Sequence, residues 1–240
     1  MNLWGVARID DFDSCQDRES RLADGRDLSV SVVVIGSGGS ELWRALKRRG
    51  FINGRPRHGF DPLDSFSRRM ISEEAEQLHL AGFEARTVFP FSRKPMDFLR
   101  LAEAAGLGTL SPVVPFLIHP EFGPWVSLRG ALIVEEELRS NGELEDFLPC
   151  RDCSCPCLDA CPVEVYGPAG EAHLSRCADE RHDGGCEGGC EVRRACPVGR
   201  EHRYDPDEEA FRHWYGLPAL RRYYGKGWWQ IVPKRIRRSL

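Results

Sequence analysis

The chain has 240 residues, of which 41% are hydrophobic, and carries a formal net charge of -4 at pH 7. It is long enough to bury a hydrophobic core and suits one larger domain with a smaller one. Its longest apolar run, residues 30–36, is far shorter than the roughly 20 residues of a membrane-spanning helix. The first residues are acidic where a signal peptide is basic. We therefore expect a globular, cytoplasmic protein without a transmembrane segment.

The first elements expected are a strand and two helices. The β-branched run at 28–36 predicts a buried strand, and the glycine-rich turn after it leads into a helix capped by Ser40 and ended by Gly50. Apolar residues at helical spacing predict a second helix over 62–81. The turn GSGGS lacks the third glycine of a dinucleotide-binding loop, and Glu41 in that place would repel a phosphate. We interpret it as a tight connection.

Three further strands and one helix follow. Residues 85–91 are expected to form a strand. A helix is predicted over 95–106, with proline at a first-turn position and Gly106 at its end. Two strand-like runs, 116–119 and 125–134, flank the turn PEFGP. The first half of the chain is thus a mixture of strands and helices.

A polar, acidic stretch at 140–149 separates this half from a cysteine-rich segment. We divide the chain into an α/β domain at 1–145, a small domain at 146–204 and a helical, basic and aromatic tail at 205–240. The basic and aromatic side chains of the last twenty residues suit binding to nucleic acid or to an anionic membrane surface. They equally suit docking onto the acidic cysteine-rich segment.

Nine of the ten cysteines lie between Cys150 and Cys196. In a reducing compartment this density indicates metal binding or redox chemistry, and argues against disulfides or ordinary buried cysteines. Bacterial ferredoxins bind [4Fe-4S] clusters through the pattern C-x2-C-x2-C-x3-C-P, in which the fourth cysteine binds the other cluster. The segment departs from this pattern by one residue, and each of its two cysteine groups ends in a similar Cys-Pro sequence, DACPV at Cys161 and RACPV at Cys196.

We expect two [4Fe-4S] clusters, each held by four thiolates. Under the ferredoxin crossing rule, the first cluster is bound by Cys150, Cys153, Cys157 and Cys196, and the second by Cys161, Cys177, Cys186 and Cys190. Cys155 is an alternative to Cys153; we favour Cys153 because C-x2-C spacing lets backbone amides turn toward sulfur. Zinc also takes four thiolates and is the competing metal, although zinc ribbons usually pair two distant C-x2-C knuckles.

The segments AGLG and LIHPEFG, followed by the cysteine clusters, resemble the family of cobalamin-dependent reductases over residues 85–200. That family includes epoxyqueuosine reductase and the reductive dehalogenases, with the vitamin B12-processing chaperones as more distant relatives. The resemblance implies an α+β protein. A nitroreductase-like α/β N-terminal domain would hold a corrinoid, and a small ferredoxin-like domain with two [4Fe-4S] clusters would supply electrons.

The chain departs from that family at the proton donor. Epoxyqueuosine reductases carry an Asp in a D-[ST]-A-P segment where Ser92 stands here, and a hydroxyl is a far weaker proton donor than a carboxylic acid. Asp97 lies nearby, within the first turn of the predicted helix, where it complements the helix dipole. His119 and Trp125 are candidates to contact a corrinoid or substrate, although turn and core packing are their ordinary roles.

We therefore expect an iron–sulfur redox protein whose clusters deliver electrons to a reductive site in the N-terminal domain, with cobalamin as the candidate cofactor there. Its electron donor would be a protein of the flavodoxin or ferredoxin reductase type, and its substrate a small molecule or a tRNA. Two alternatives stay open. One is a dicluster carrier that serves a partner reductase, and the other is an accessory protein of tRNA modification.

Overall fold

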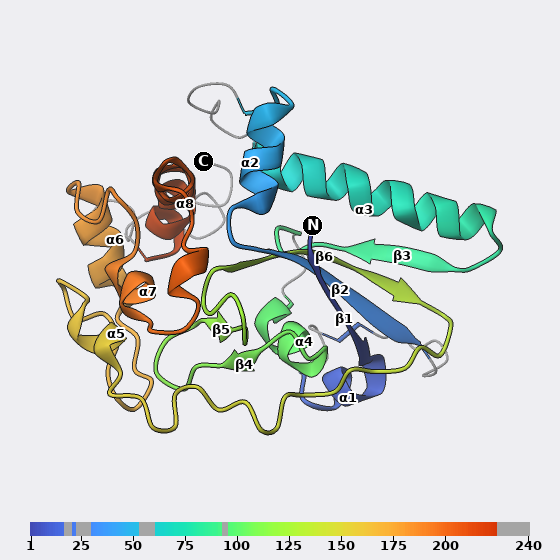
Figure 1. Ribbon diagram of the computed structural model, residues 1–240, viewed down its shortest axis with the longest axis horizontal. Helices are drawn as coiled ribbons and strands as arrows, with labels where there is room; N and C mark the ends of the chain where they lie inside the picture. Colours follow the sequence, from blue (N-terminus) through green and yellow to red (C-terminus); the bar gives the residue numbers. More distant parts are fainter. Residues whose placement is uncertain (17–20, 23–29, 53–60, 93–95, 225–240) are drawn as a thin grey trace.

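A computed structural model describes residues 1–16, 21–22, 30–52, 61–92 and 96–224. At its centre is a four-stranded antiparallel sheet in the order β1-β2-β6-β3, shown in Figure 1. Its strands are β1 (Leu3–Arg8), β2 (Ser31–Gly38), β3 (Ala85–Val88) and β6 (Val126–Val134). A separate ribbon pairs β4 (Thr109–Leu110) with β5 (Leu117–Ile118).

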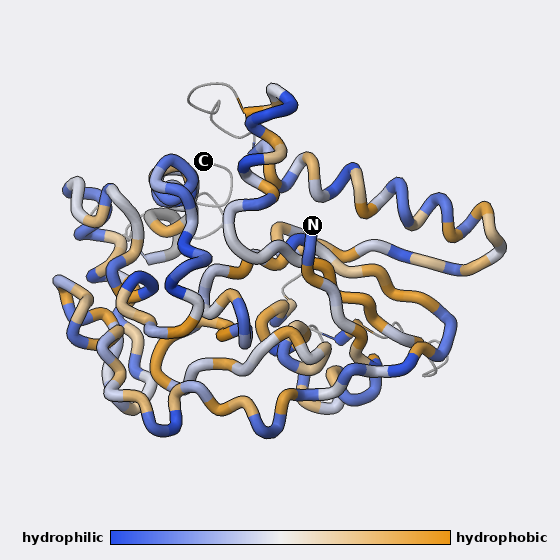
Figure 2. Tube along the Cα trace, viewed as in Figure 1, coloured by the Kyte–Doolittle hydropathy of each residue, from blue (hydrophilic) through white to orange (hydrophobic). Residues whose placement is uncertain are grey.

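Strand β2 lies inside the sheet and is covered on both faces, which explains its continuous β-branched sequence. Val32 and Val34 belong to the larger hydrophobic core, whereas Val33 and Ile35 pack against a smaller core on the other face. This division follows from the alternation of side chains along a strand. Hydrophobic residues accordingly follow one another along the central strands in Figure 2.

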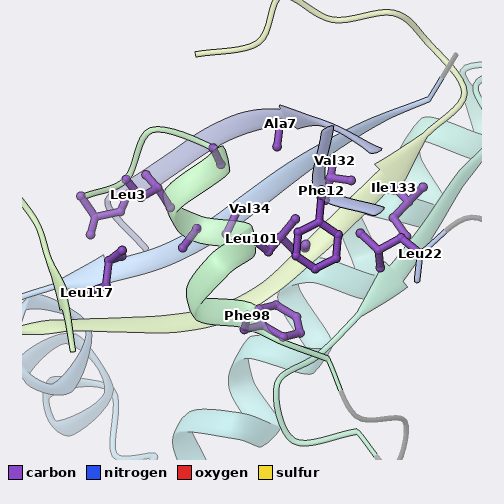
Figure 3. Close-up of a cluster of buried hydrophobic side chains, with 14 of the residues drawn as sticks. Leu3, Ala7, Phe12, Leu22, Val32, Val34, Phe98, Leu101, Leu117 and Ile133 are labelled. Carbon is purple, nitrogen blue, oxygen red and sulfur yellow. The ribbon is translucent and has the colours of Figure 1, made fainter. Parts of the chain in front are cut away.

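Helices cover both faces of the sheet. Helices α1 (Ile9–Ser14) and α4 (Phe98–Ala104) lie on one face, where Phe12, Phe98 and Leu101 meet the strands (Figure 3). The long helix α3 (Pro62–Leu80) lies on the opposite face and buries Ile71 against β6 and β3 (Figure 1). The N-terminal part is thus a mixed α/β structure of three layers.

The last described helix, α8 (Pro206–Tyr224), packs on α2 (Glu41–Arg48). The rings of Phe211 and Trp43 are 5.0 Å apart, and Arg44 forms an ion pair with Asp205 just before α8. Residues 206–224, which the sequence assigns to the C-terminal tail, therefore contact the N-terminal part. Residues 225–240, with most of the basic side chains of that tail, lie outside the described residues.

The cysteine-rich part gathers short helices at one side of the sheet, beside α8 (Figure 1). They are α5 (Pro156–Asp159), α6 (Leu174–His182), α7 (Glu191–Ala195) and the 3-10 helix η1 (Arg200–His202). A small core of Val113, Val114, Val165 and Val192 joins them to the segment between β4 and β5. Within the described ranges, no helix is both long and apolar enough to cross a lipid bilayer.

Local capping decides where the helices begin. The helix predicted over 62–81 is confirmed, because the Asp61 side chain accepts hydrogen bonds from the backbone N–H of Leu63 at 2.7 Å and of Asp64 at 3.2 Å. The helix predicted to begin at residue 95 begins at Phe98, since Asp97 is its N-cap and accepts from the N–H of Arg100 at 3.0 Å.

Two local predictions are wrong. Ser40 precedes α2 but does not cap it, because its hydroxyl donates to Glu208 at 2.6 Å and accepts from the N–H of Asp205 at 2.7 Å. A contact distant in sequence has replaced the local one. The strand predicted over 85–91 ends at Val88, where its pairing with β6 ends.

Candidate functional site

Four cysteines line one cavity of about 200 Å³ in the cysteine-rich part. They are Cys161, Cys177, Cys186 and Cys190. Cys161 follows α5, Cys177 belongs to α6, and the other two lie in the loop between α6 and α7. The fold thus brings together the four thiols that the crossing rule assigns to the second cluster; we call this space the Cys161 cavity.

The other cysteines of the segment line a second, smaller cavity, of about 20 Å³. They are Cys150, Cys153, Cys155, Cys157 and Cys196. Cys196 reaches this group from beyond α7, and Val192 of α7 lines both cavities. The two cavities, the second of which we call the Cys150 cavity, therefore share a wall. The tenth cysteine, Cys15, is exposed and lines neither of them.

The Cys150 cavity has five thiols where a cluster needs four. Cys155 has a left-handed backbone with φ 52°, and its N–H lies 3.4 Å from the sulfur of Cys153. The Cys155 thiol is 3.5 Å from the carbonyl oxygen of Cys153. An N–H donor stabilises a thiolate, whereas a carbonyl accepts from a protonated thiol. These contacts favour Cys153 as the ligand, which stays a prediction.

Burial raises the pKa of several of these thiols. It raises the pKa of Cys157 to about 11, and it also lifts the pKa values of Cys177, Cys186 and Cys196 above the ordinary range. Such thiols stay protonated at neutral pH unless a metal takes the place of the proton. The surroundings thus favour either neutral thiols or thiolates bound to a cationic centre.

In the part of the chain that the structure describes, no three His, Cys, Asp or Glu side chains converge closely enough to hold a single metal ion. A zinc ion would need its sulfur ligands about 2.3 Å away. Around the Cys161 cavity, the thiols instead enclose a space of about 200 Å³. That arrangement suits a polynuclear centre better than a single ion, and cluster binding remains a prediction.

A third cavity, of about 420 Å³, lies where the N-terminal part meets α7 and α8. Its polar and charged lining residues are Asp97, Ser127, Arg193 and Arg212. Its apolar wall includes Met96, Phe98, Leu99, Phe116, Leu117 and Pro124. The size and the few polar groups on an apolar surface are typical of a small-molecule site. We call this space the Asp97 cavity.

The Asp97 cavity adjoins both cysteine-lined cavities. Arg193 and Arg212 line it together with the Cys161 cavity, and Phe116 lines it together with the Cys150 cavity. The guanidinium carbon of Arg193 lies 4.8 Å from the centre of the Phe116 ring. Each cysteine-lined cavity thus shares at least one lining side chain with the Asp97 cavity.

Two arginines, Arg129 and Arg212, share a hydrogen-bond acceptor in the lining of the Asp97 cavity. Arg212 donates to the hydroxyl of Ser127 at 3.2 Å, and Arg129 donates to the same hydroxyl. Arg212 is paired with Glu208 at 2.7 Å and Arg129 with Asp64 at 3.3 Å. Burial lowers the pKa of Arg129 to about 10 and raises that of Asp64 to about 6. Both guanidinium groups therefore stay charged at neutral pH.

Of the candidate acids, Asp97 lines this cavity and Ser92 does not. Ser92 is exposed and lies outside the lining of this cavity, whereas Asp97, which is also exposed, belongs to the lining. Asp97 combines two roles, because one carboxylate oxygen caps α4 while the residue faces the opening. Residues 93–95, which follow Ser92 in the sequence, lie outside the described residues.

His119 and Trp125 have structural partners. His119 accepts hydrogen bonds at Nδ1 from the N–H groups of Glu121 at 3.0 Å and Phe122 at 3.2 Å, so it holds the turn after β5. Burial lowers the pKa of His119, which keeps the ring neutral. Trp125 has 0% exposure and packs edge-on against Tyr204 at 5.3 Å. Neither residue lines the Asp97 cavity.

Four residues of the junction were absent from the sequence candidates: Phe116, Ser127, Arg193 and Arg212. The position of Arg193 could have been inferred from the sequence, because it lies between the cysteines at 190 and 196 and must therefore be near a set of thiols. No sequence pattern pointed to Arg212 or Ser127. Their approach depends on the packing of α8 against β6, which no local pattern encodes.

No protein family and no curated protein matches the sequence. Solved structures do match. An epoxyqueuosine reductase from Streptococcus thermophilus aligns with a TM-score of 0.55 and 17% identity over 90% of this chain and 72% of that one. Another, solved with an epoxyqueuosine-modified tRNA-Tyr stem loop, has a TM-score of 0.55 and 16% identity over 87% of this chain and 66% of that one.

A structure of a reductive dehalogenase, described in terms of B12-dependent dehalogenation, aligns with a TM-score of 0.56 and 13% identity over 92% of this chain. The chain spans 33% of that dehalogenase and 64% of a selenomethionine-labelled epoxyqueuosine reductase. Similarity at this level of identity establishes a common fold. The mixed α/β arrangement seen here is therefore the fold of these reductases.

Proposed function

We propose that this protein is an iron–sulfur oxidoreductase in which two [4Fe-4S] clusters deliver electrons to a reductive site at the Asp97 cavity. The observation that carries the proposal is the sorting of nine cysteines into two adjoining cavities with at least four thiols each. A cubane cluster requires four thiolates around a compact inorganic core. The clusters would be held by the two ligand sets that the crossing rule predicts.

The adjoining cavities support electron transfer as the role of the clusters. Val192 separates the two sets of thiols, and Arg193 and Phe116 separate them from the Asp97 cavity. A cluster accepts and releases single electrons with little rearrangement of its ligands. Electrons from a protein of the flavodoxin or ferredoxin reductase type would pass through the clusters to a molecule in the Asp97 cavity.

Cobalamin is the cofactor that we propose for the Asp97 cavity, on the basis of the shared fold and of the B12-dependent dehalogenase among the neighbours. The lining fits such a group in kind: an apolar wall for the ring, and Ser127 and Arg212 for its polar side chains. When bound, cobalamin would supply the cobalt-centred reductive chemistry. The protein would exclude water and hold the charged groups in position.

Asp97 is the residue that we propose as the proton donor. It lines the cavity, and its carboxyl group is held by the N–H of Arg100 at 3.0 Å. A carboxyl group placed at a reducible ligand can deliver the proton that accompanies electron transfer. In this chain Asp97 would take the part for which Ser92, a weaker acid outside the cavity lining, is unsuited.

The test is anaerobic purification and reconstitution of the full chain with iron and sulfide. We expect a brown protein with about eight iron atoms per chain. Hydroxocobalamin is then added to the loaded protein, and a shifted corrinoid spectrum is expected. A colourless protein that holds zinc would overturn the proposal. A brown protein that leaves the corrinoid spectrum unchanged would overturn the cobalamin site and favour the carrier function.

A carrier that serves a partner reductase is the second candidate. It is favoured by Cys190, an exposed residue of the Cys161 cavity, because a cluster near the surface can exchange electrons with another protein. The two functions differ in one measurement. A carrier transfers electrons to a partner protein but reduces no small molecule in the Asp97 cavity.

A role in tRNA modification, with tRNA as substrate or partner, is the third candidate, and it draws on the neighbour that was solved with a tRNA stem loop. Neutral glutamines in place of Lys234, Arg235, Arg237 and Arg238 test it in the full-length chain. If tRNA binds through this tail, the variant should lose affinity and the salt dependence of binding should weaken. Unchanged binding would exclude the tail as the tRNA site.

A further inference from the structure

Two arginines of the Cys161 cavity have an N–H group without an acceptor. The Nε atoms of Arg181 and Arg193 are buried and have no hydrogen-bond partner among the described residues, and both arginines line this cavity. A buried donor left without a partner costs roughly 1–3 kcal/mol, and more when it is charged. The pair therefore indicates that the cavity holds a hydrogen-bond acceptor with negative charge.

Arg181 is fixed at one side of the cavity. It belongs to α6 and donates to the carbonyl oxygen of His213 in α8. Cys177, on the same helix, lines the cavity together with it. Burial lowers the pKa of Arg181, whereas the thiolates of the cavity raise it, so the group stays charged at neutral pH. Its position between α6 and α8 keeps this charge against the sulfur ligands.

Arg193 is fixed at another side, in α7. Its guanidinium lies over the rings of Phe116 at 4.8 Å and Tyr204 at 5.8 Å, and among the described residues no carboxylate pairs with it. The adjacent Arg194 differs, because it is paired with Glu209 and with Glu191 at 3.0 Å. The charge of Arg193 thus remains available to the cavities that it lines.

The remaining charged groups around the cavity largely neutralise one another. Arg212 is paired with Glu208, and the two carboxylates at 191 and 209 are paired with Arg194. His213 also lines the cavity, and burial lowers its pKa and keeps it neutral. Glu180 is the one other lining carboxylate among the described residues. Arg181 and Arg193 are thus the two lining arginines that have no carboxylate partner among the described residues, so their guanidinium groups remain available to an acceptor in the cavity.

The Cys150 cavity has different surroundings. Apart from its cysteines it is lined by Ser111, Val114, Phe116, Ile118, Val192, Val198 and prolines. None of these described lining side chains carries a charge. The two sets of thiols are therefore alike in ligand type and differ in electrostatic environment.

We propose that Arg181 and Arg193 donate hydrogen bonds to sulfur atoms of the cluster in the Cys161 cavity and raise its reduction potential above that of its neighbour. This inference rests on the proposed function. Reduction adds one electron and no proton to a cluster with four thiolate ligands, so the reduced form carries more negative charge. Nearby cations and N–H donors stabilise that form, and such groups are established determinants of cluster potential.

The experiment is a redox titration of the loaded full-length protein with dithionite as reductant, followed by electron paramagnetic resonance. We expect two separate one-electron steps in the wild type. Arg193→Gln and Arg181→Gln should each shift the higher step to a lower potential and leave the lower step unchanged. Arg193→Lys retains the charge without the Nε–H, so it should produce a smaller shift in the same direction.

Arg176→Gln is the matched control. Arg176 belongs to the same helix as Arg181, is exposed, and donates to the carbonyl oxygen of Glu164 outside the cavity. We expect it to leave both potentials unchanged. Each variant is compared at the iron content of the wild type, and the substitutions at 181 and 193 provide two independent measurements if one of them fails to load.

Each outcome separates this inference from the proposed function. Loaded variants whose potentials match the wild type would overturn the inference alone. So would a wild type whose two steps coincide, or a shift of the higher step to more positive potential. A wild-type chain that takes up no cluster would overturn the proposed function, and the tuning role of the arginines with it.

Discussion

Gly123 lies against Val198 so closely that a Cβ on the glycine would stand 2.0 Å from the carbonyl oxygen of Val198. Gly123 belongs to the turn after β5 in the N-terminal part, whereas Val198 comes two residues after Cys196. The turn and the segment that brings Cys196 to the Cys150 cavity are therefore in direct backbone contact. A side chain at position 123 must displace that segment.

The first prediction follows from this contact. Gly123→Ala should be strongly destabilising and should lower the iron content, because it shifts the backbone next to Cys196. The control is Gly142→Ala, which also has a positive φ, +69° against +53°, but open space around the added methyl group. The control should lose only roughly 1–2 kcal/mol through backbone strain. Equal losses in urea unfolding and equal iron content would contradict the role of the contact.

The second prediction separates the two neighbouring thiols. Cys153→Ser should lower the iron content by about four atoms per chain, because it removes a ligand, whereas Cys155→Ser should retain the full content. The measurement is iron and sulfide analysis with visible absorbance after reconstitution. Cys15→Ser, at an exposed site away from both cavities, is the control. Loss of iron in the Cys155 variant alone would reverse the assignment.

The third prediction concerns Asp97. Asp97→Asn keeps an oxygen that can cap α4 but removes the acid, whereas Asp97→Ala removes both. The alanine variant should lose about 1 kcal/mol of unfolding free energy and the asparagine variant less. Both should lose reductase activity, if Asp97 donates the proton. Ser92→Ala should keep the activity, and an active Asp97→Asn enzyme would rule out this donor.

The fourth prediction is a pH dependence. Burial raises the pKa of Asp64 from 3.8 to about 6, so the folded state binds this proton more tightly than the unfolded chain. The stabilising contribution is fully present below the unfolded value and is lost as pH rises through about 6. The difference in unfolding free energy between the wild type and Asp64→Asn should fall over this range by at most about 3 kcal/mol.

The control for Asp64 is a carboxyl group of opposite behaviour. The hydrogen bond from Arg44 lowers the pKa of Asp205, so its contribution is present above 3.8 and is lost as pH falls. Asp205→Asn should therefore differ from the wild type with the reverse sign. A titration of the Asp64 carboxyl carbon by nuclear magnetic resonance should show a midpoint near 6; a midpoint near 4 would contradict the effect of burial.

Helices with local signals were predictable, and an edge strand was not. The range 62–81 combines helical spacing with Asp61 and Pro62, and the helix Pro62–Leu80 follows it closely. No element was expected at residues 3–8. That strand depends on its pairing with β2, and Trp4 on it is 68% exposed, so the usual alternation of buried and exposed residues gives a weak pattern.

The candidate site was also predictable only in part. The grouping of the cysteines followed from their spacing and from the Cys-Pro pairs, which are properties of one short segment. The surroundings of the thiols did not follow from it. Arg193 meets Phe116 only because the segment between β4 and β5 packs on α7, and Arg212 arrives from α8. Contacts between distant segments thus determine the electrostatics around each set of thiols.

The interleaving of the two thiol sets has a consequence for biosynthesis. In sequence order, Cys161 precedes the three cysteines with which it shares a cavity. Cys196 follows all the other cysteines of both cavities. On the ribosome, one set becomes complete at Cys190 and the other at Cys196, after the whole N-terminal part has been made. Cofactor insertion into the nascent protein would therefore come late, onto an N-terminal part that has already been synthesised.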